Sequence, residues 1–358
     1  MILHIVPMLF DGQGRVRGGA ERYSLELAKQ QARSGPVRLV SFGARDEQAL
    51  VDGVDVRIIG GDWADRGRAH DPASTAILGH IRSAAVVHCH QREVRISKLS
   101  AMAARVARKR VVVTDHGGGA WSWASRIPAY RLFHAHLHVS EFSRALSGHP
   151  ASPRTAVIGA GVDTERYAPA AAGNGSRRVL FVGRLLPHKG VDYLIEGLPA
   201  GLGLDVVGPA SDARYVGDLE ELARGRDVAF HHDWDDARAA GAYKAALCVV
   251  LPSVHRDRYG SEHIAPELLG QTLLEGMASG APAICTAVGG MPEVVVAGET
   301  GFIVPPNDPQ ALGDALARLA ANARERTRMA ERARARVLEH FTWDAVDRRC
   351  RAAYGTAA

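Results

Sequence analysis

The chain is organised around Pro266–Glu293, which reads PELLGQTLLEGMASGAPAICTAVGGMPE. Two glutamates in this stretch, Glu267 and Glu275, are separated by seven residues. The glycine and the apolar run between them predict a loop followed by a helix that begins near Gly270 or Gln271. The free N–H groups and the positive dipole end of such a helix favour an anion, for example a diphosphate.

The two glutamates allow two interpretations. If the segment were helical throughout, their carboxylates would lie two turns and ~12 Å apart. Each carboxylate would then hold one end of an elongated, hydroxyl-rich ligand lying across the helix start. In the other interpretation Glu275 is a surface helix residue, and Glu267 is a helix-start residue that the dipole stabilises.

Composition sets the class of protein. The 358 residues suffice for two domains, and 46% hydrophobic and 23% charged residues are typical of a soluble globular protein. We see no apolar run near 18 residues and no basic lead for a signal peptide, so we expect a cytoplasmic protein. The basic residues behind the formal charge of +5 are spread along the chain without interleaved aromatic residues, which argues against nucleic acid as a partner. Four widely spaced cysteines indicate neither a zinc site nor a disulfide framework: Cys89, Cys248, Cys285 and Cys350.

Strands and helices alternate through the first half of the chain. A strand at Met1–Val6 is followed by a turn with Gly18 and Gly19, and then by a helix to about Arg33. The glycine spacing does not fit a dinucleotide fingerprint, which disfavours a nicotinamide dehydrogenase. Alternation of this kind predicts a doubly wound parallel sheet. The further strands expected are Val37–Phe42, Val54–Ile59, Ala85–His88, Arg110–Thr114 and Leu137–Ser140, with helices at Ala73–Arg82, Arg95–Arg108 and Glu141–Leu146.

Histidines collect near the ends of these strands. His116 lies in the glycine-rich loop Asp115–Gly119, directly after a strand. The others are His88, His90, His134, His136 and His138. Alternate residues of a strand share a face, so a metal site is conceivable here. Because no acidic residue or cysteine accompanies them at metal-ligand spacing, we expect imidazoles that hydrogen-bond backbone groups, and no metal.

The second half repeats the alternation. Its expected strands are Arg178–Val182, Leu204–Val207, Val228–Phe230, Leu247–Leu251, Ala283–Thr286 and Gly301–Val304, and Pro309–His340 reads as two helices. The first of these strands runs into the loop Gly183–Gly190, in which Arg184 and Lys189 bring two positive charges to the end of a strand. The breaker-rich stretch Ala168–Ser176 is typical of a linker. We therefore expect domains at 1–168 and 169–340, with a final helix at 341–358 that braces both.

These motifs together resemble the family-4 retaining glycosyltransferases. The resemblance rests on Glu-x7-Glu with its Gly-Gly-Met-Pro-Glu turn at 289–293, on Gly183-Arg184-x4-Lys189-Gly190, and on Gly18-Gly19-Ala20-Glu21. It implies that Glu267 contacts the transferred sugar, that Glu275 contacts the ribose, and that His116 lies near the sugar. The implied catalytic residues are His116, Arg184, Lys189 and Glu267. The implied donor-binding residues are Gly18, Gly19, Gly183, Arg184, Lys189, Asp233, Glu267, Gly270, Gln271, Thr272 and Glu275.

The resemblance also implies an architecture and a reaction. The fold would be GT-B, with two facing Rossmann-like domains and the donor in the cleft between them. The first domain would bind the acceptor and the second the nucleotide sugar. The enzyme would move a hexose from a nucleoside diphosphate sugar, with UDP expected, to a hydroxyl of a small molecule, natural product or glycan. It would retain the anomeric configuration and use neither metal nor cofactor. Two alternatives stay open: a nucleotide-sugar epimerase or hydrolase, and a non-catalytic nucleotide-sugar binder.

Three stretches depart from the family's pattern or leave their role open. His231–Trp234 replaces a segment that usually has a glycine near the nucleobase, and Gly159-Ala160 replaces Pro-Asn. Val254–Ala265 lengthens the approach to Glu267, and either lines the sugar pocket or forms a solvated loop. An acceptor wall formed by the loop at Asp11–Arg17 and three tryptophans is a further hypothesis: Trp63, Trp121 and Trp123. The basic helix Ala101–Arg110 suits a solvated surface better than an anionic membrane.

Overall fold

The computed structural model describes residues 1–11, 14, 16–61, 71–116, 129–148, 151–152, 154–170 and 177–355. The chain forms two compact units. The first unit contains Met1–Gly161 together with Trp343–Ala358, and the second contains Val162–Thr342. The division therefore falls before the predicted boundary after position 168, and the final helix belongs to the first unit.

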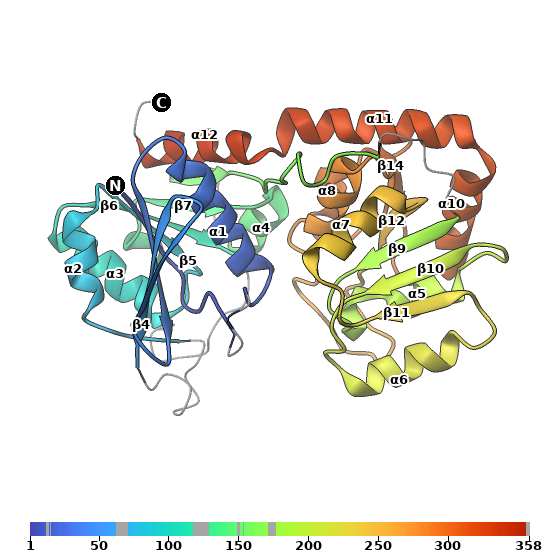
Figure 1. The fold of residues 1–358 in the computed structure, drawn as a ribbon, viewed down its shortest axis with the longest axis horizontal. Coiled ribbons are helices and arrows are strands. Elements are labelled where there is room, and N and C mark those ends of the chain that lie inside the picture. The colour runs from blue at the N-terminus through green and yellow to red at the C-terminus, as the bar shows by residue number, and fades with distance from the viewer. Residues whose placement is uncertain are drawn as a thin grey trace. The chain divides into compact units, whose positions relative to one another are not determined.

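The first unit is built on an eight-stranded sheet in the order β3-β4-β2-β1-β5-β6-β7-β8 (Figure 1). All neighbouring strands run parallel except β3 and β4, which form an antiparallel hairpin. The strands are β1 (Ile2–Ile5), β2 (Val37–Gly43), β3 (Glu47–Val51), β4 (Val54–Gly60), β5 (Val86–His90), β6 (Arg110–Asp115), β7 (Ala135–His138) and β8 (Thr155–Val157).

Helices cover both faces of this sheet. On one face, α1 (Gly19–Ala32) contacts β2 and α12 (Trp343–Tyr354). On the other face, α3 (Arg95–Val106) contacts β5, β6 and α2 (Ile77–Ser83). Alternation along β1 divides the core, because Leu3 and Ile5 pack toward α2 and α3 whereas Val6 packs with residues of α1. The remaining short helices are η2 (Ala129–Arg131) and α4 (Glu141–Leu146).

The hairpin of β3 and β4 was not predicted. It turns at Asp52 and Gly53, whose φ angles are 45° and 85°. An Asp-Gly pair with both φ angles positive is the pattern of a type I′ hairpin turn, so the sequence did contain the signal. The pattern was overlooked because β3 is an exposed edge strand, on which Leu50 keeps 77% of its surface accessible.

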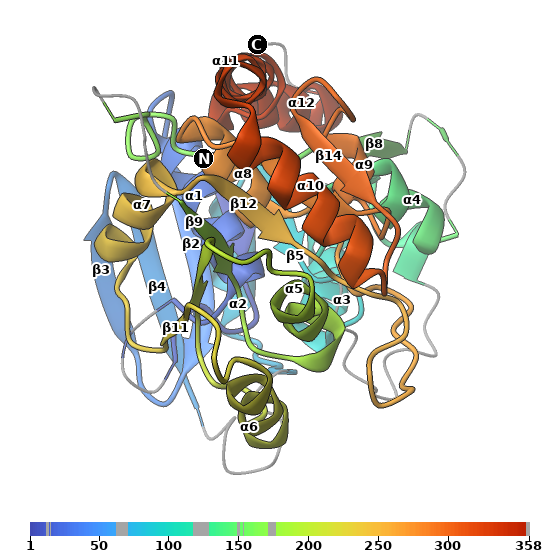
Figure 2. The same ribbon diagram turned by 90° about the vertical axis from the view of Figure 1, so that its right-hand side faces the viewer.

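The second unit has a six-stranded, wholly parallel sheet in the order β11-β10-β9-β12-β13-β14. Its helices form two groups: α5 contacts α6 and α10, and α8 contacts α7 and α11 (Figure 2). The strands are β9 (Arg178–Val182), β10 (Gly203–Val207), β11 (Val228–His231), β12 (Cys248–Leu251), β13 (Ala283–Thr286) and β14 (Gly301–Val304). The helices are η3 (Pro187–Lys189), α5 (Val191–Glu196), α6 (Ala213–Leu222), α7 (Asp236–Ala245), α8 (Gln271–Ala278), α9 (Met291–Val294), α10 (Pro309–Ala321) and α11 (Ala323–His340).

Both units confirm the predicted doubly wound α/β class. In each, successive strands are added first on one side of a central strand and then on the other, so that β1/β5 and β9/β12 are neighbours at which the winding reverses. Ligands of such sheets bind beyond the carboxyl ends of the strands at this reversal. No helix within the described ranges combines the length and the apolar character needed to cross a membrane.

Candidate functional site

The second unit places the two conspicuous motifs at its reversal point. The loop Gly183–Gly190, called the donor loop below, follows β9, and the segment that follows β12 leads to Glu267 and α8. β9 and β12 are hydrogen-bonded neighbours. Residues that lie far apart in the sequence therefore meet at the carboxyl edge of one sheet.

Close backbone contacts fix the donor loop. Gly190 has a φ of +68°, and a Cβ at this position would lie 2.1 Å from the carbonyl oxygen of Pro252. The amide of Val254 donates to the carbonyl of His188 at 2.9 Å. Only glycine allows this approach, because any side chain would collide with the backbone that leaves β12. The contact brings Lys189 to the end of β12.

Lys189 and Glu267 form an ion pair, with 2.5 Å between Nζ and Oε2. Their side chains keep only 14% and 15% of their surface exposed. The backbone of Glu267 is held as well: its carbonyl accepts from the amide of Gly290 at 3.2 Å, and a Cβ on Gly289 would lie 1.8 Å from that oxygen. The Gly-Gly-x-Pro-Glu turn therefore sets the position of Glu267.

Helix α8 begins at Gln271, as predicted, with Gly270 at its N-cap in a left-handed conformation (φ 100°). The first helical amide bonded to this cap is that of Leu273, which donates to the carbonyl of Gly270. The amides of Gln271 and Thr272 precede it at the positive end of the helix dipole. Glu267 lies in the preceding loop, so the separation expected for one continuous helix does not apply.

Glu275 is a half-buried residue of α8. Its Oε2 accepts a hydrogen bond of 2.8 Å from the hydroxyl of Tyr243 on α7. Glu275 is therefore not the exposed surface residue of the second interpretation, because its carboxylate is half-buried and bonded to the neighbouring helix. Sequence reasoning did not single out Tyr243, since a tyrosine inside a helix gives no signal of its partner.

The donor loop also carries Arg184 and His188. Arg184 is exposed, and within the described part of the chain it has no ion-pair partner, which leaves its charge available to an anion. His188 is partly buried beside Lys189. Burial, reinforced by that ammonium, lowers the pKa of His188 to about 4. The imidazole is therefore neutral at pH 7, and the positive charges of the loop are Arg184 and Lys189.

The segment Val254–Ala265 is an ordered loop that packs against the donor loop. The carboxylate of Asp257, 3% exposed, accepts from the amides of Tyr259 and Ser261 and from Nε2 of His263 at 2.8 Å. The His263 ring then lies 4.9 Å from that of His188. These contacts hold the base of the loop, whereas Arg256, Arg258 and Glu262 are exposed, so both interpretations of the segment stay open.

Two further residues lie at the carboxyl edge of the sheet, of which one was predicted to bind the donor and the other was not. Asp233, predicted to bind the donor, is exposed after β11, where the ring of His231 stacks on Trp234 at 3.9 Å and bonds Asp205. Ser253, which was not predicted, is fully buried after β12, and its hydroxyl finds no hydrogen-bond partner among the described residues. A buried hydroxyl in this state suits a polar group of a ligand.

The first unit holds the remaining predicted site residues. Gly18 caps α1 in an extended conformation and Gly19 opens the helix, where an added Cβ would meet nothing within 4 Å. His116 follows β6, and its ring lies 4.7 Å from that of Tyr23. The other residues of its glycine-rich loop at 117–119 lie outside the described residues, as do Trp63, Trp121 and Trp123 of the hypothetical acceptor wall.

Four of the five histidines predicted beside His116 have hydrogen-bond partners of two kinds, and the fifth, His138, is buried at the end of β7. His134 and His136 bond backbone groups, namely those of Val111 and Tyr130. His88 and His90 bond side chains instead, and they lie beside His4, which sequence reasoning missed. The signal for His4 was weak: a polar residue in the otherwise apolar strand β1. One ring nitrogen from each of His4, His88 and His90 can be chosen so that all three lie within 4.8 Å of one another.

Family models match both halves of the chain. The model described as "Glycosyl transferases group 1" matches residues 164–336, and that of "Glycosyltransferase Family 4" matches residues 17–166. Several relatives are named D-inositol 3-phosphate glycosyltransferase. One from Corynebacterium glutamicum is 32% identical over 57% of this chain and 52% of its own length. One from Corynebacterium diphtheriae is 28% identical over 99% of this chain and 93% of its own.

Solved structures share the fold over the full chain. The Anabaena HepE protein in complex with UDP and glucose superimposes with a TM-score of 0.75 at 18% identity, covering 99% of both chains. Sucrose-phosphate synthase of Thermosynechococcus elongatus gives 0.71 at 20% identity, covering 99% of this chain and 98% of its own. The fold is thus GT-B, as predicted. With both halves matched by their family models, the chain belongs to glycosyltransferase family 4.

Proposed function

We propose that this glycosyltransferase transfers a hexose from a nucleoside diphosphate sugar to a hydroxyl of its acceptor, with retention of anomeric configuration and without a metal. The observation that carries the proposal is the Lys189–Glu267 pair at 2.5 Å, at the end of the strands where the sheet reverses. A cation and a carboxylate held in contact provide two separate functions for a glycosyl diphosphate. The ammonium attracts the diphosphate, and the carboxylate accepts hydrogen bonds from sugar hydroxyls.

Charge development explains the proposed chemistry. As the bond between sugar and phosphate breaks, negative charge grows on the leaving diphosphate. Lys189, the exposed Arg184 and the first amides of α8 at Gln271 and Thr272 all favour that charge, and their positions are fixed before reaction begins. Because these groups supply the neutralising charge, the proposed reaction requires no metal ion.

The proposal also names a donor nucleotide and a class of acceptor. We propose UDP as the nucleotide, in line with the UDP bound in the HepE structure. A relative from Mycolicibacterium smegmatis is named as GDP-mannose-dependent, so GDP-mannose is the competing donor. For the acceptor we propose a small hydroxyl-rich molecule or a glycan. Inositol 3-phosphate and phosphatidylinositol, which appear in relatives' names, are the first candidates to examine.

A donor panel tests the proposal. UDP-, GDP-, ADP- and dTDP-sugars are ranked by thermal shift, since a ligand of the folded state raises stability by RT ln(1 + [L]/Kd). The best donor is then incubated with each acceptor, and released nucleoside diphosphate is measured. We expect release that depends on the acceptor. Release without acceptor would indicate a hydrolase, a changed sugar without release would indicate an epimerase, and binding without either would indicate a non-catalytic protein.

Two further measurements test the finer claims. Proton NMR of the fresh product reports the anomeric configuration from its coupling constant, and an inverted product would disprove retention. Turnover measured with and without EDTA is expected to be the same. Loss of turnover in EDTA that Mg²⁺ or Mn²⁺ restores would disprove metal independence.

A further inference from the structure

The first unit contains a row of four histidines that the proposed chemistry leaves unexplained. We call His4, His88, His90 and His116 the histidine row. His4 and His88 are paired in register on the adjacent strands β1 and β5, so their side chains share one face of the sheet. His4, His88 and His90 have at most 1% of their surface exposed. Each ring nitrogen of these three buried imidazoles needs a hydrogen-bond partner.

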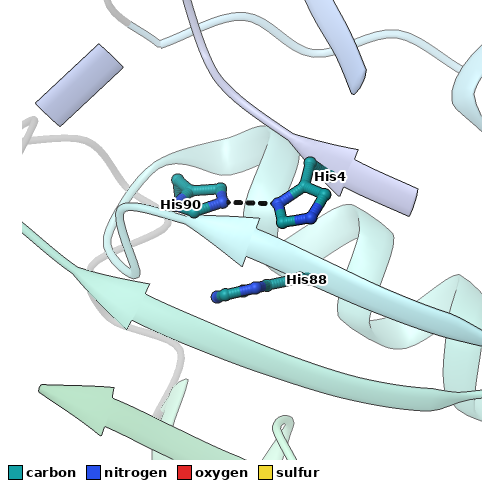
Figure 3. A group of neighbouring side chains, drawn as sticks. All are labelled: His4, His88 and His90. Atoms are coloured by element: carbon teal, nitrogen blue, oxygen red, sulfur yellow. Dashed lines mark hydrogen bonds between the residues drawn. The ribbon is translucent and has the colours of Figure 1, made fainter. Parts of the chain in front are cut away.

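Hydrogen bonds connect three of these four histidines, namely His4, His90 and His116. Nε2 of His4 lies 2.9 Å from Oε1 of Gln31 on α1, and its Nδ1 lies 3.0 Å from Nε2 of His90 (Figure 3). Nδ1 of His90 lies 3.1 Å from Nε2 of His116. His88 takes a separate pair of partners, the hydroxyls of Tyr354 at 2.8 Å and Thr114 at 2.7 Å. The path from Gln31 to His116 is therefore continuous.

The geometry does not suit a metal ion, although three of these histidines are close enough to suggest one. The lone pairs of an imidazole lie in the plane of the ring, so ligands of one ion must point their ring edges toward a common centre. Here the rings of His88 and His90 stack, with centroids 4.4 Å apart and planes inclined by 25°, so their edges do not share a centre. The nitrogens of His4 and His90 that face each other are already joined by a hydrogen bond.

Gln31 determines which ring nitrogen donates and which accepts along this path of hydrogen bonds. Its amide nitrogen lies 3.2 Å from the hydroxyl of Tyr354, and its carbonyl oxygen faces His4. With the Gln31 amide in this orientation its carbonyl oxygen accepts, so Nε2 of His4 carries the proton, and Nδ1 of a neutral ring is then an acceptor. Nε2 of His90 must donate to it, which leaves Nδ1 of His90 to accept from Nε2 of His116.

The rings are neutral, as this scheme requires. Burial lowers the pKa of His4 and of His116 to about 4, and it lowers the pKa values of His88 and His90 well below the usual 6.5. A neutral His116 with its proton on Nε2 keeps a lone pair on Nδ1. The Tyr23 ring, inclined at 60° to that of His116, packs beside it and limits its rotation.

We propose that Gln31, His4 and His90 are positioning residues that hold His116 as the neutral Nε2–H tautomer and so make its Nδ1 a hydrogen-bond acceptor for a substrate hydroxyl. The part concerning substrate rests on the proposed function. A lone pair at this position accepts from a neutral hydroxyl of a sugar or polyol. It repels phosphate or carboxylate oxygens, and so favours an uncharged part of the substrate.

The tautomer is measured directly by two-bond ¹H–¹⁵N correlation on protein labelled with [¹⁵N]histidine, with the His116 signals assigned from a His116→Gln variant. The wild-type protein without substrate is expected to show His116 protonated on Nε2 alone. A ring protonated on Nδ1, or on both nitrogens at pH 7, would overturn the inference. Since no turnover is involved, this result is independent of the proposed function.

Gln31→Glu reverses the direction without changing the size of the side chain. A buried carboxyl group enters with a proton, and the imidazole of His4 is a much stronger base than the hydroxyl of Tyr354. The carboxyl therefore donates to His4, Nδ1 of His4 becomes the donor, and the reversal reaches His116. The expected result is a switch of His116 to the Nδ1–H form and a loss of about tenfold in kcat/KM.

The matched control is Gln30→Glu, one residue away on the outer side of α1, where Gln30 bonds Asp344 of α12. The His116 spectrum of this variant is expected to equal that of the wild type. An unchanged His116 tautomer in Gln31→Glu would contradict the inference, and so would stoichiometric Co²⁺ binding that His4→Ala abolishes. Absent turnover in a wild-type protein with the expected tautomer would instead count against the proposed function alone.

Discussion

The two units share the doubly wound topology, but the point at which the sheet reverses is charged in one unit and uncharged in the other. Where the sheet of the second unit reverses, the structure holds an ion pair and an exposed cation: Lys189 with Glu267, and Arg184. Where the sheet of the first unit reverses, it holds the buried and neutral histidine row. The same edge of a doubly wound sheet can thus present fixed charge or directed hydrogen bonds. Which of these it presents depends on how much water the neighbouring helices leave at that edge.

For the first unit, burial of the histidine row predicts sensitivity to mild acid. In the unfolded chain these rings have a pKa near 6.5, whereas in the folded chain the values are lower, about 4 for His4 and His116. Their stabilising contribution is complete above pH 6.5 and is lost as pH falls toward 4. One pH unit below 6.5 each of these two rings costs about 1.4 kcal/mol, so His4 and His116 together cost about 3 kcal/mol at pH 5.5. Burial of His88 and His90 acts in the same direction.

Hydrogen exchange with mass spectrometry at pH 7.5, 6.5 and 5.5, corrected for intrinsic rates, separates the two units. We expect protection to fall in β1, β5 and β6 before it falls in β9 and β12. In the second unit, His188 is the one histidine of the described residues with a resolved lowered pKa. Carboxylates with lowered pKa values, such as Asp55 and Asp205, lose their contribution only below about pH 4. Equal loss of protection in both units at pH 5.5 would refute the contrast.

For the second unit, removal of Lys189 tests the role of fixed charge. Lys189→Ala is expected to lower kcat by roughly 10²–10³-fold, because it removes one preorganised cation from the leaving diphosphate. The comparison is with Lys244→Ala, which removes the other lysine of this unit, at the end of α7. Steady-state kinetics with the preferred donor measures both. Equal and small losses in the two variants would show that the charge at position 189 is not used.

A substitution in the turn at 289–293, which positions Glu267, is expected to have a smaller effect, on the free energy of unfolding, and a closely matched control exists. Gly289→Ala would place a Cβ 1.8 Å from the Glu267 carbonyl oxygen at a φ of +60°, whereas at Gly298, with a φ of +76°, nothing lies within 4 Å. Gly298→Ala should cost about 1 kcal/mol from its backbone conformation alone. Gly289→Ala should cost about 3 kcal/mol in urea unfolding. A difference below about 0.5 kcal/mol would mean that the turn does not hold Glu267 in place.

The smallest expected effect concerns Glu275. Tyr243→Phe removes the hydroxyl that donates to its carboxylate at 2.8 Å. We expect about fivefold weaker binding of UDP, the usual size for one lost hydrogen bond, measured by isothermal titration calorimetry. Tyr215→Phe removes a comparable buried bond, of 2.6 Å to Asp192, and should lower stability without changing UDP affinity. Unchanged affinity in Tyr243→Phe would remove Glu275 from the proposed ribose contact.

Much of the second unit could be predicted because its site is local in sequence. The positions of Gly183, Arg184 and Lys189 relative to β9 follow from one strand and the loop behind it. The start of α8 at Gln271 follows from Gly270. What the motif could not reveal is the contact of Lys189 with Glu267 across 78 positions. The order in which β9 and β12 join the sheet creates that contact.

The first unit was less predictable for a physical reason. His4 bonds Gln31 and His90, which are 27 and 86 positions away, and Gln31 bonds Tyr354 across 323 positions. A lone histidine in an apolar strand has no spacing pattern, so nothing local distinguishes it. The glycine at position 159 was noticed only as a departure from the family. Its φ of +76° explains why glycine stands there, and its carbonyl accepts a hydrogen bond from Tyr23.

The sequence by itself determined the alternation of strands and helices, the two doubly wound sheets and the chemical character of the donor loop. These depend on periodicity and on turn residues, which act over a few positions. Tertiary structure alone decided that Lys189 meets Glu267, and that His4 and His90 form a neutral, directed path of hydrogen bonds that ends at His116. Such contacts depend on which strands become neighbours and on how completely the helices exclude water, and neither is written in any short stretch of the chain.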